Sequence, residues 1–295
     1  MKKFSEYITE ALIDVDAADI NKIYEPLREP IKELTAILNR DPSNISRHDF
    51  LEVISQYQSS HVPTPLKVIS SKELKSKTAK EAHEINPITI KVYLFPPKGN
   101  RYLMKDSGAL IEVGISDGFL EFLTENNIQF MENKAIHLQY MKNCITDVRI
   151  KSTIRHELTH WLDDSLHNMH LSNAAKGFRT LMRSGPSKDV QNFYKKAVAH
   201  GEDDPYLAPL EITAAVNQIA EVKRRIGEKK YNALTWADLI EMVPSLGNLN
   251  ARLGAEWRKR MFSRLARENL IGTNLTKNLE SSLINTLRKI HDYDR

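Results

Sequence analysis

The chain has 295 residues, of which 41% are hydrophobic, and a formal net charge of +4, which suits a globular protein with a sizeable core. The sequence has no run of about 18 apolar residues and no secretion signal, so we expect neither a membrane span nor export, and we place the chain in a cytoplasm-like compartment. The single cysteine, Cys144, cannot form an internal disulfide and is a poor basis for a zinc-thiolate site, so we expect any metal to be held by histidine and carboxylate.

The first part of the chain reads as helical. Residues 16–40 and 46–58 carry apolar residues at helical spacing, and Ser46 stands in a cap position before the second run. The stretch HVPTP ends this part at Pro65.

Between residues 66 and 140 the composition and the spacing of apolar residues favour a small sheet. Residues 88–96 and 109–115 are β-rich, residues 135–141 (AIHLQYM) alternate, and residues 96–100 and 105–108 have turn chemistry. We expect AIHLQYM to form a strand at the edge of this sheet.

After Asn143 the sequence is again helical, with segments at residues 145–164, 189–200, 209–227, 249–269 and 273–292. The fold class is therefore α+β, mainly helical, with a small mixed or antiparallel sheet. We predict four regions: a short amino-terminal segment at 1–10, a helical region at 11–63, a domain that contains the sheet at 64–220, and a basic helical region at 221–295.

The stretch IRHELTHWLDD contains an HExxH motif. Its spacing places His156 and His160 on one side of a helix, one turn apart, so that both imidazoles can reach one metal ion. Glu157 is placed to take a proton from an attacking water. The alternative is an ordinary helix whose histidines are core or surface residues.

A catalytic zinc needs a third protein ligand, and the first candidates follow the motif directly. Where the metzincin pattern requires a glycine and a histidine, this chain has Asp163 and Leu166, which disfavours that class. Asp163 and Asp164 are so close to the motif that we expect them to orient a histidine or cap the helix rather than bind the metal.

Two glutamates further along the chain remain as candidates for the third ligand. Glu202 lies in a predicted loop, whereas Glu211 falls in the first turn of a helix that Pro209 can open. A ligand fixed on a helix is better preorganised than one on a loop, so we favour Glu211.

HELTHWLDD followed by PLEITA resembles the gluzincins, and especially the small metallopeptidases that tailed phages encode. The resemblance covers about residues 130–220 and implies a zincin-like fold beside the HExxH helix, with zinc held by His156, His160 and Glu211 and with Glu157 as general base. It also implies cleavage of a protein or peptide laid in extended form along a sheet edge. The gap between His160 and Glu211 is longer than in many gluzincins.

A transition-state oxyanion usually has a protein donor as well as the metal. Tyr206, His200 and Tyr194 are candidates for this donor, each with the alternative of being a packed or surface side chain.

The opening MKKFSEYITEAL reads from its residues as a short amphipathic helix. It also resembles the amino-terminal capsid-targeting peptides of internal proteins of large myovirus-type phages, with Ile8 and Glu10 at the expected positions and Ala11 after the cleavage point. This resemblance implies that the chain acts in the host cytoplasm or the virion interior, with capsid components as partners.

From Glu221 to the end, 15 Lys and Arg stand against 9 Asp and Glu. The densest basic residues are Arg252, Arg258, Lys259, Arg260, Arg264 and Arg267. They read as a solvated helix surface or as a nucleic-acid contact. The second reading supports an alternative function, a non-catalytic internal or structural virion protein on a peptidase-like scaffold.

Overall fold

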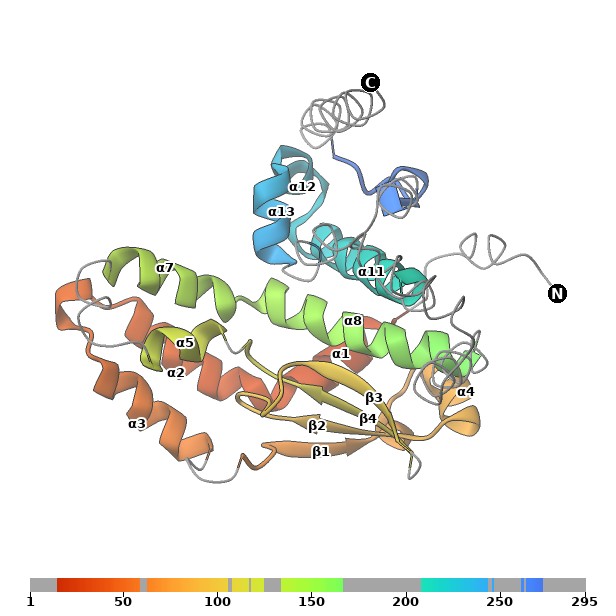
Figure 1. Ribbon diagram of the computed structural model, residues 1–295, viewed down its shortest axis with the longest axis horizontal. Helices are drawn as coiled ribbons and strands as arrows, with labels where there is room; N and C mark the ends of the chain where they lie inside the picture. The colour runs from red at the N-terminus through yellow and green to blue at the C-terminus, as the bar shows by residue number, and fades with distance from the viewer. Residues whose placement is uncertain are drawn as a thin grey trace, which may run out of the picture. The chain divides into compact units, whose positions relative to one another are not determined.

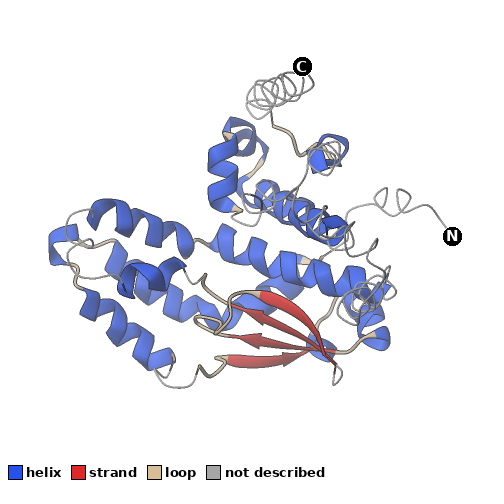
Figure 2. Cartoon of the chain, viewed as in Figure 1, coloured by secondary structure: helices blue, strands red, loops and turns tan. Residues whose placement is uncertain are grey.

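The computed structural model describes residues 15–58, 63–105, 108–116, 118–124, 134–166, 208–243, 246, 261–262 and 264–272. The chain divides into two compact units, residues 13–176 and a second unit of residues 1–12 with 177–295. The described residues are mainly helical and include one small mixed sheet, which agrees with the predicted α+β class (Figures 1 and 2).

The unit of residues 13–176 begins with three helices, α1 (Ala17–Tyr24), α2 (Arg28–Leu38) and α3 (Arg47–Tyr57), joined by short 3-10 turns at Glu25–Leu27 and Pro42–Asn44. The Asp16 side chain caps α1, and Ser46 and Asp49 form a capping box at the start of α3. These side chains satisfy backbone N–H groups that a helix start leaves without partners. The prediction of helices here, including the Ser46 cap, is confirmed.

The sheet has four strands, β1 (Lys67–Ser70), β2 (Ile88–Val92), β3 (Arg101–Lys105) and β4 (Gly108–Val113), in the order β1-β2-β4-β3. β2 and β4 are parallel, whereas β1 pairs with β2 and β3 pairs with β4 in antiparallel fashion. β2 lies within the predicted stretch at 88–96, and β4 begins one residue before the predicted stretch at 109–115. β1 and β3, the two outer strands, were not predicted.

One row of side chains crosses the whole sheet. Ile69, Ile90, Ile111 and Tyr102 are successive register partners on β1, β2, β4 and β3. The three isoleucines are fully buried in the core of this unit. Because neighbouring partners point to the same face of a sheet, Tyr102 ends this row on the core side.

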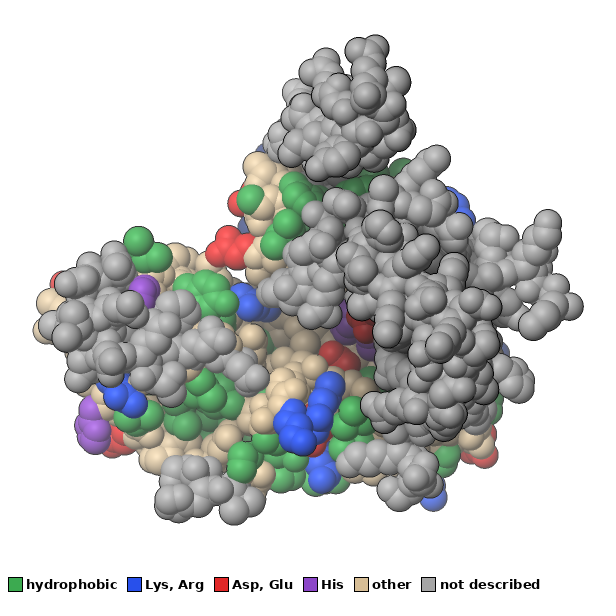
Figure 3. Space-filling view, in the orientation of Figure 1, with side chains coloured by type: hydrophobic (Ala, Val, Ile, Leu, Met, Phe, Trp, Pro, Cys, Tyr) green, Lys and Arg blue, Asp and Glu red, His purple; other side chains and the backbone are tan. Residues whose placement is uncertain are grey.

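The opposite face of the sheet is more exposed. Val68 on β1 retains 51% of its accessible surface, and Lys and Arg side chains lie over the strands on the face seen in Figure 3. The sheet is thus of the one-sided kind, with one apolar face packed against helices and one partly solvated face.

Gly114 follows β4, where the chain must pass close to another backbone segment. A Cβ atom there would lie 2.3 Å from the carbonyl oxygen of Tyr93 and 2.9 Å from Cδ of Pro96. The close approach is held by hydrogen bonds from the Tyr93 N–H to the Val113 carbonyl and from the Ile115 N–H to the Leu94 carbonyl, both 2.9 Å. Only glycine fits this position without displacing backbone.

Three more helices accompany the sheet, α4 (Lys77–Ile85), α5 (Gly118–Thr124) and α7 (Lys134–Cys144). The prediction of a strand at AIHLQYM is wrong, because residues 135–141 lie within α7. The buried residues of α7 are Leu138, Met141 and Cys144, three apart, whereas Ile136 is 70% exposed. The apolar residues therefore follow a helical period rather than the period of two that a half-buried strand requires.

The helix that carries the HExxH motif is α8 (Asp147–Leu166). Within its unit it packs against α4, α1, β4 and β3, and Ile154, Leu158 and Trp161 join the core. Ser152, Thr159 and Ser165 donate their hydroxyl hydrogens to carbonyl oxygens of the preceding turn at 2.6 to 2.8 Å. These local bonds allow polar side chains to be buried within the helix.

The second unit contains α11 (Ala208–Ile226), α12 (Glu228–Ala233) and α13 (Trp236–Met242). Its buried side chains include Ile212, Val216, Ile219, Val222, Tyr231, Leu239, Met261 and Leu265. Gly227 joins α11 to α12 with a φ of 80°, a conformation that favours glycine. Among the helices that the structure describes, none is long and apolar enough to cross a membrane.

Candidate metal centre

The two motif histidines lie side by side on α8 as the spacing predicts. Their Nε2 atoms are 3.1 Å apart, and the rings are 4.7 Å apart between centroids and nearly perpendicular. Two nitrogens bound at about 2.0–2.1 Å to one tetrahedral zinc would lie about 3.3 Å apart. The His156–His160 pair therefore fits two adjacent positions of a tetrahedral zinc.

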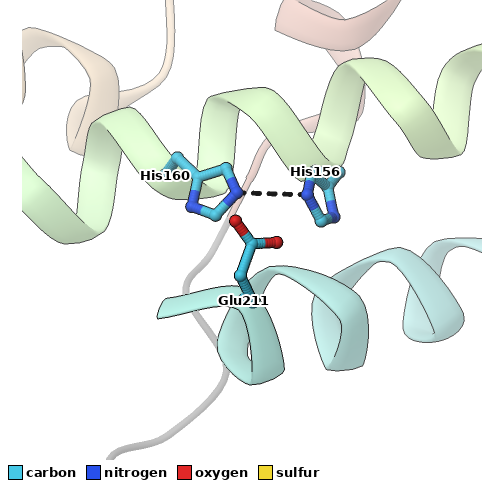
Figure 4. A group of neighbouring side chains, drawn as sticks. All are labelled: His156, His160 and Glu211. Atoms are coloured by element: carbon cyan, nitrogen blue, oxygen red, sulfur yellow. Dashed lines mark hydrogen bonds between the residues drawn. The ribbon is translucent and has the colours of Figure 1, made fainter. Parts of the chain in front are cut away.

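Glu211 completes a group of three side chains that could hold a metal ion. It lies in the first turn of α11, and one ligand atom each from His156, His160 and Glu211 all lie within 4.8 Å of one another (Figure 4). Two imidazole nitrogens and one carboxylate oxygen are a donor set that suits zinc. Of the described aspartates that follow the motif, Asp163 and Asp164 do not belong to this group.

Glu157 follows the first histidine and is only 6% exposed. A carboxylate is almost never this deeply buried unless it has partners or a task. Burial reduces the access of bulk water, which strengthens the interaction of this carboxylate with any charge that approaches it. The structure therefore places the motif glutamate away from bulk water.

The aspartates after the motif are also buried, Asp163 to 5% exposure and Asp164 to 2%. The Tyr102 hydroxyl donates to Oδ2 of Asp164 at 2.6 Å, and the Tyr102 ring stacks on that of His160 with an interplanar angle of 18°. Desolvation by burial, together with the hydrogen bond to Asp164, raises the pKa of Tyr102 above its ordinary value. The hydroxyl consequently stays protonated and acts as a donor.

No local sequence pattern points to Tyr102. It lies on a five-residue strand that the alternation pattern did not reveal, and the partner of its hydroxyl is 62 residues away. Only the register of β3 beside β4 brings it to the face of the sheet that packs on α8.

A second hydrogen bond anchors α8 next to the histidines. Trp161 is fully buried, and its indole N–H donates to the backbone carbonyl of Asn86 at 2.9 Å. The Asn86 side-chain amide in turn lies 3.5 Å from the Tyr102 hydroxyl, to which it donates. The carboxyl-terminal turns of α8 are thus attached both to β3 and to the segment that follows α4.

Other buried charges on α8 have structural partners. Lys151 forms an ion pair with Asp147 at 2.8 Å and lies over the Tyr24 ring, 4.3 Å from its centroid. Arg155 donates to the Val15 carbonyl at 3.3 Å. These contacts attach α8 to α1 and the residues before it, so that the motif lies on a helix held from several sides.

Several predicted residues lie outside the described part of the chain, namely His200, Tyr206, Tyr194, Glu202 and the targeting peptide at 1–10. Of the basic residues in the tail third, Arg252, Arg258, Lys259 and Arg260 also lie outside it. Arg264 is described, and the prediction that it belongs to a solvated or nucleic-acid-binding surface is wrong. It is buried, and its guanidinium donates to the Thr213 hydroxyl at 2.6 Å.

No protein-family model, no curated protein and no solved structure matches this chain. The functional assignment therefore depends on the chemistry of the residues described above.

Proposed function

We propose that the chain is a zinc-dependent endopeptidase with a zincin-like catalytic unit. The observation that carries the proposal is the pair of Nε2 atoms of His156 and His160, 3.1 Å apart on one helix, with the Glu211 carboxylate in the same group. The buried glutamate between the two histidines and the resemblance of HELTH to the gluzincin motif support the same conclusion.

The three side chains of this group would hold the zinc. When bound, zinc acts as a Lewis acid that polarises a peptide carbonyl and makes a coordinated water more acidic. Glu157 would accept a proton from the attacking water as a general base. It would then donate that proton to the leaving amine as a general acid. Deep burial of Glu157 keeps bulk solvent from competing for that proton.

The substrate would be an extended protein or peptide segment. β3 pairs with β4 along one edge and contacts α8, and no further strand pairs with its other edge among the described residues. An edge strand can bind an extended backbone through main-chain hydrogen bonds. AIHLQYM was expected to be the edge strand that binds the substrate backbone, and we assign this role to β3 instead.

The resemblance of the first residues to phage targeting peptides adds a cellular setting to the proposal. The enzyme would act in the host cytoplasm or inside a virion, with capsid proteins among its partners. A chain recovered from virions with a new amino terminus at Ala11 would support this setting.

The first experiment measures the zinc content of purified wild type, Glu211→Ala and Glu228→Ala by plasma emission spectrometry. Glu228 is an exposed glutamate of the same unit, so its variant controls for loss of a negative charge. We expect about one zinc per chain in wild type and Glu228→Ala and a sharp reduction in Glu211→Ala, because two imidazoles alone bind the ion more weakly. A wild type that stays free of zinc after zinc is offered would overturn the proposal in favour of the non-catalytic virion protein.

The second experiment tests the chemistry with Glu157→Gln. This variant keeps the size of the side chain and the metal-binding group but loses the proton acceptor, so it should retain zinc and lose at least about 100-fold in hydrolysis of a mixed peptide library. Equal hydrolysis by wild type and Glu157→Gln would contradict the proposed role of Glu157.

A further inference from the structure

Tyr102 makes two contacts with the end of α8 that carries His160 and one contact with Asn86, which follows α4. Its hydroxyl donates to Asp164, its ring stacks on His160, and its oxygen accepts from the Asn86 amide. His160 and Asp164 are one helical turn apart, so both project from the same side of α8. The Tyr102 side chain on β3 therefore contacts both His160 and Asp164 on this side of α8.

The geometry of the stack restricts the His160 ring. The two ring planes differ by only 18°, with centroids 6.4 Å apart. Contact with the Tyr102 ring would limit rotation of the imidazole and so favour the orientation in which its Nε2 lies 3.1 Å from that of His156. A ring that can rotate freely must lose that freedom when it binds a metal, and a ring already held in place does not.

The hydroxyl of Tyr102 holds the turn that follows. Asp164 is 2% exposed and would be costly to bury as a charged group without hydrogen bonds. The 2.6 Å bond from Tyr102 is short, as expected for a donor to a carboxylate. Trp161 is bonded to Asn86. The segment of α8 from His160 to Asp164 therefore contacts neighbouring elements at three residues, because His160 and Asp164 contact Tyr102 and Trp161 contacts Asn86.

We propose that Tyr102 is a positioning residue for the metal site, acting on His160 through its ring and on Asp164 through its hydroxyl. The inference depends on the proposed function, because it assigns Tyr102 a role in how His160 binds zinc. Side chains that orient metal-binding histidines typically change metal affinity by about 10- to 100-fold when they are replaced. We expect Tyr102→Phe to weaken zinc binding by about tenfold and Tyr102→Leu, which also removes the ring, by about 100-fold.

The experiment uses the full chain and measures zinc affinity by competition with a chromophoric chelator, together with the visible spectrum of the cobalt(II)-substituted protein. The matched control is Tyr57→Phe, which also removes a tyrosine hydroxyl bonded to a carboxylate, that of Glu33, within the same unit. Asp164→Asn is a second test that keeps the Tyr102 ring in place. Thermal unfolding of each metal-free variant reports the general loss of stability.

Weaker zinc binding and an altered cobalt spectrum in Tyr102→Phe and Asp164→Asn, with both unchanged in Tyr57→Phe, would support the inference. Unchanged affinity and spectrum in the two site variants, in a protein whose wild type binds one zinc, would overturn the role of Tyr102 and leave the proposed function intact. If affinity falls in Tyr57→Phe as much as in Tyr102→Phe at similar losses of thermal stability, Tyr102 is only a structural residue. A wild type that binds no zinc would overturn both proposals.

Discussion

Replacing Trp161 by Phe tests the tie between α8 and the segment after α4. The change removes the indole N–H and leaves the buried Asn86 carbonyl without that donor, at a cost of about 1–3 kcal/mol. The smaller ring also leaves a void in a position that is fully buried, worth about 1 kcal/mol. We therefore expect the free energy of unfolding to fall by about 2–4 kcal/mol.

Urea unfolding followed by far-ultraviolet circular dichroism measures this loss. Trp236→Phe is the matched control, since Trp236 is only half-buried and its ring packs against Phe262 at 5.4 Å in the other unit. We expect the control to lose less than about 1 kcal/mol. Losses of equal size in the two variants, or a loss below about 0.5 kcal/mol in Trp161→Phe, would refute the argument that the bond to Asn86 holds α8.

Two further predictions concern the unit of residues 13–176. Gly114→Ala should lower the free energy of unfolding by more than about 2 kcal/mol, because its Cβ would meet the Tyr93 carbonyl oxygen; a midpoint equal to wild type in urea would contradict this. The hydrogen bond that Tyr57 donates to Glu33 raises the pKa of Tyr57 to about 12. Its contribution to stability is complete below about pH 10, where the unfolded tyrosine also keeps its proton, and is lost as pH rises through about 12. The stability difference between wild type and Tyr57→Phe should shrink over this range, and a constant difference would count against the bond.

The parts of the fold that depend on local sequence could be predicted. The HELTH pair needs only helical spacing, and the Ser46 cap needs only residues within three positions of it. Glu211 could be favoured because Pro209 predicts where its helix begins. In each case the deciding information lies within a few residues.

The missed features depend on contacts between distant residues. β1 (KVIS) has a single buried residue and β3 (RYLMK) has no β-branched residue, whereas β2, which is also only five residues long, is rich in them. In AIHLQYM apolar and polar residues alternate, but the buried residues are three apart, because one face of the helix packs against the core. Tyr102 and Asn86 reach α8 across 62 and 75 residues of sequence, which no local pattern encodes.

These distant contacts bear on whether the proposed zinc would serve catalysis or structure. α8 is fixed by core side chains such as Leu158 and by the bonds of Trp161, Arg155 and Asp164, none of which involves the Nε2 atoms of His156 and His160. A structural zinc site supplies folding energy itself, so its protein unfolds when the metal is removed. Here we expect chelation to lower the melting temperature only by the amount that ligand binding adds through mass action.

The test is a circular dichroism spectrum of the chelated protein at 25 °C, with zinc added back afterwards. A helical spectrum that survives chelation, with hydrolysis lost and then restored by zinc, is the result expected of a catalytic metal on a scaffold that folds by itself. Collapse of the helical signal on chelation would show that zinc holds the fold. In that case the contacts around α8 would be insufficient to preorganise the site, and a structural role would explain the HELTH motif better than catalysis.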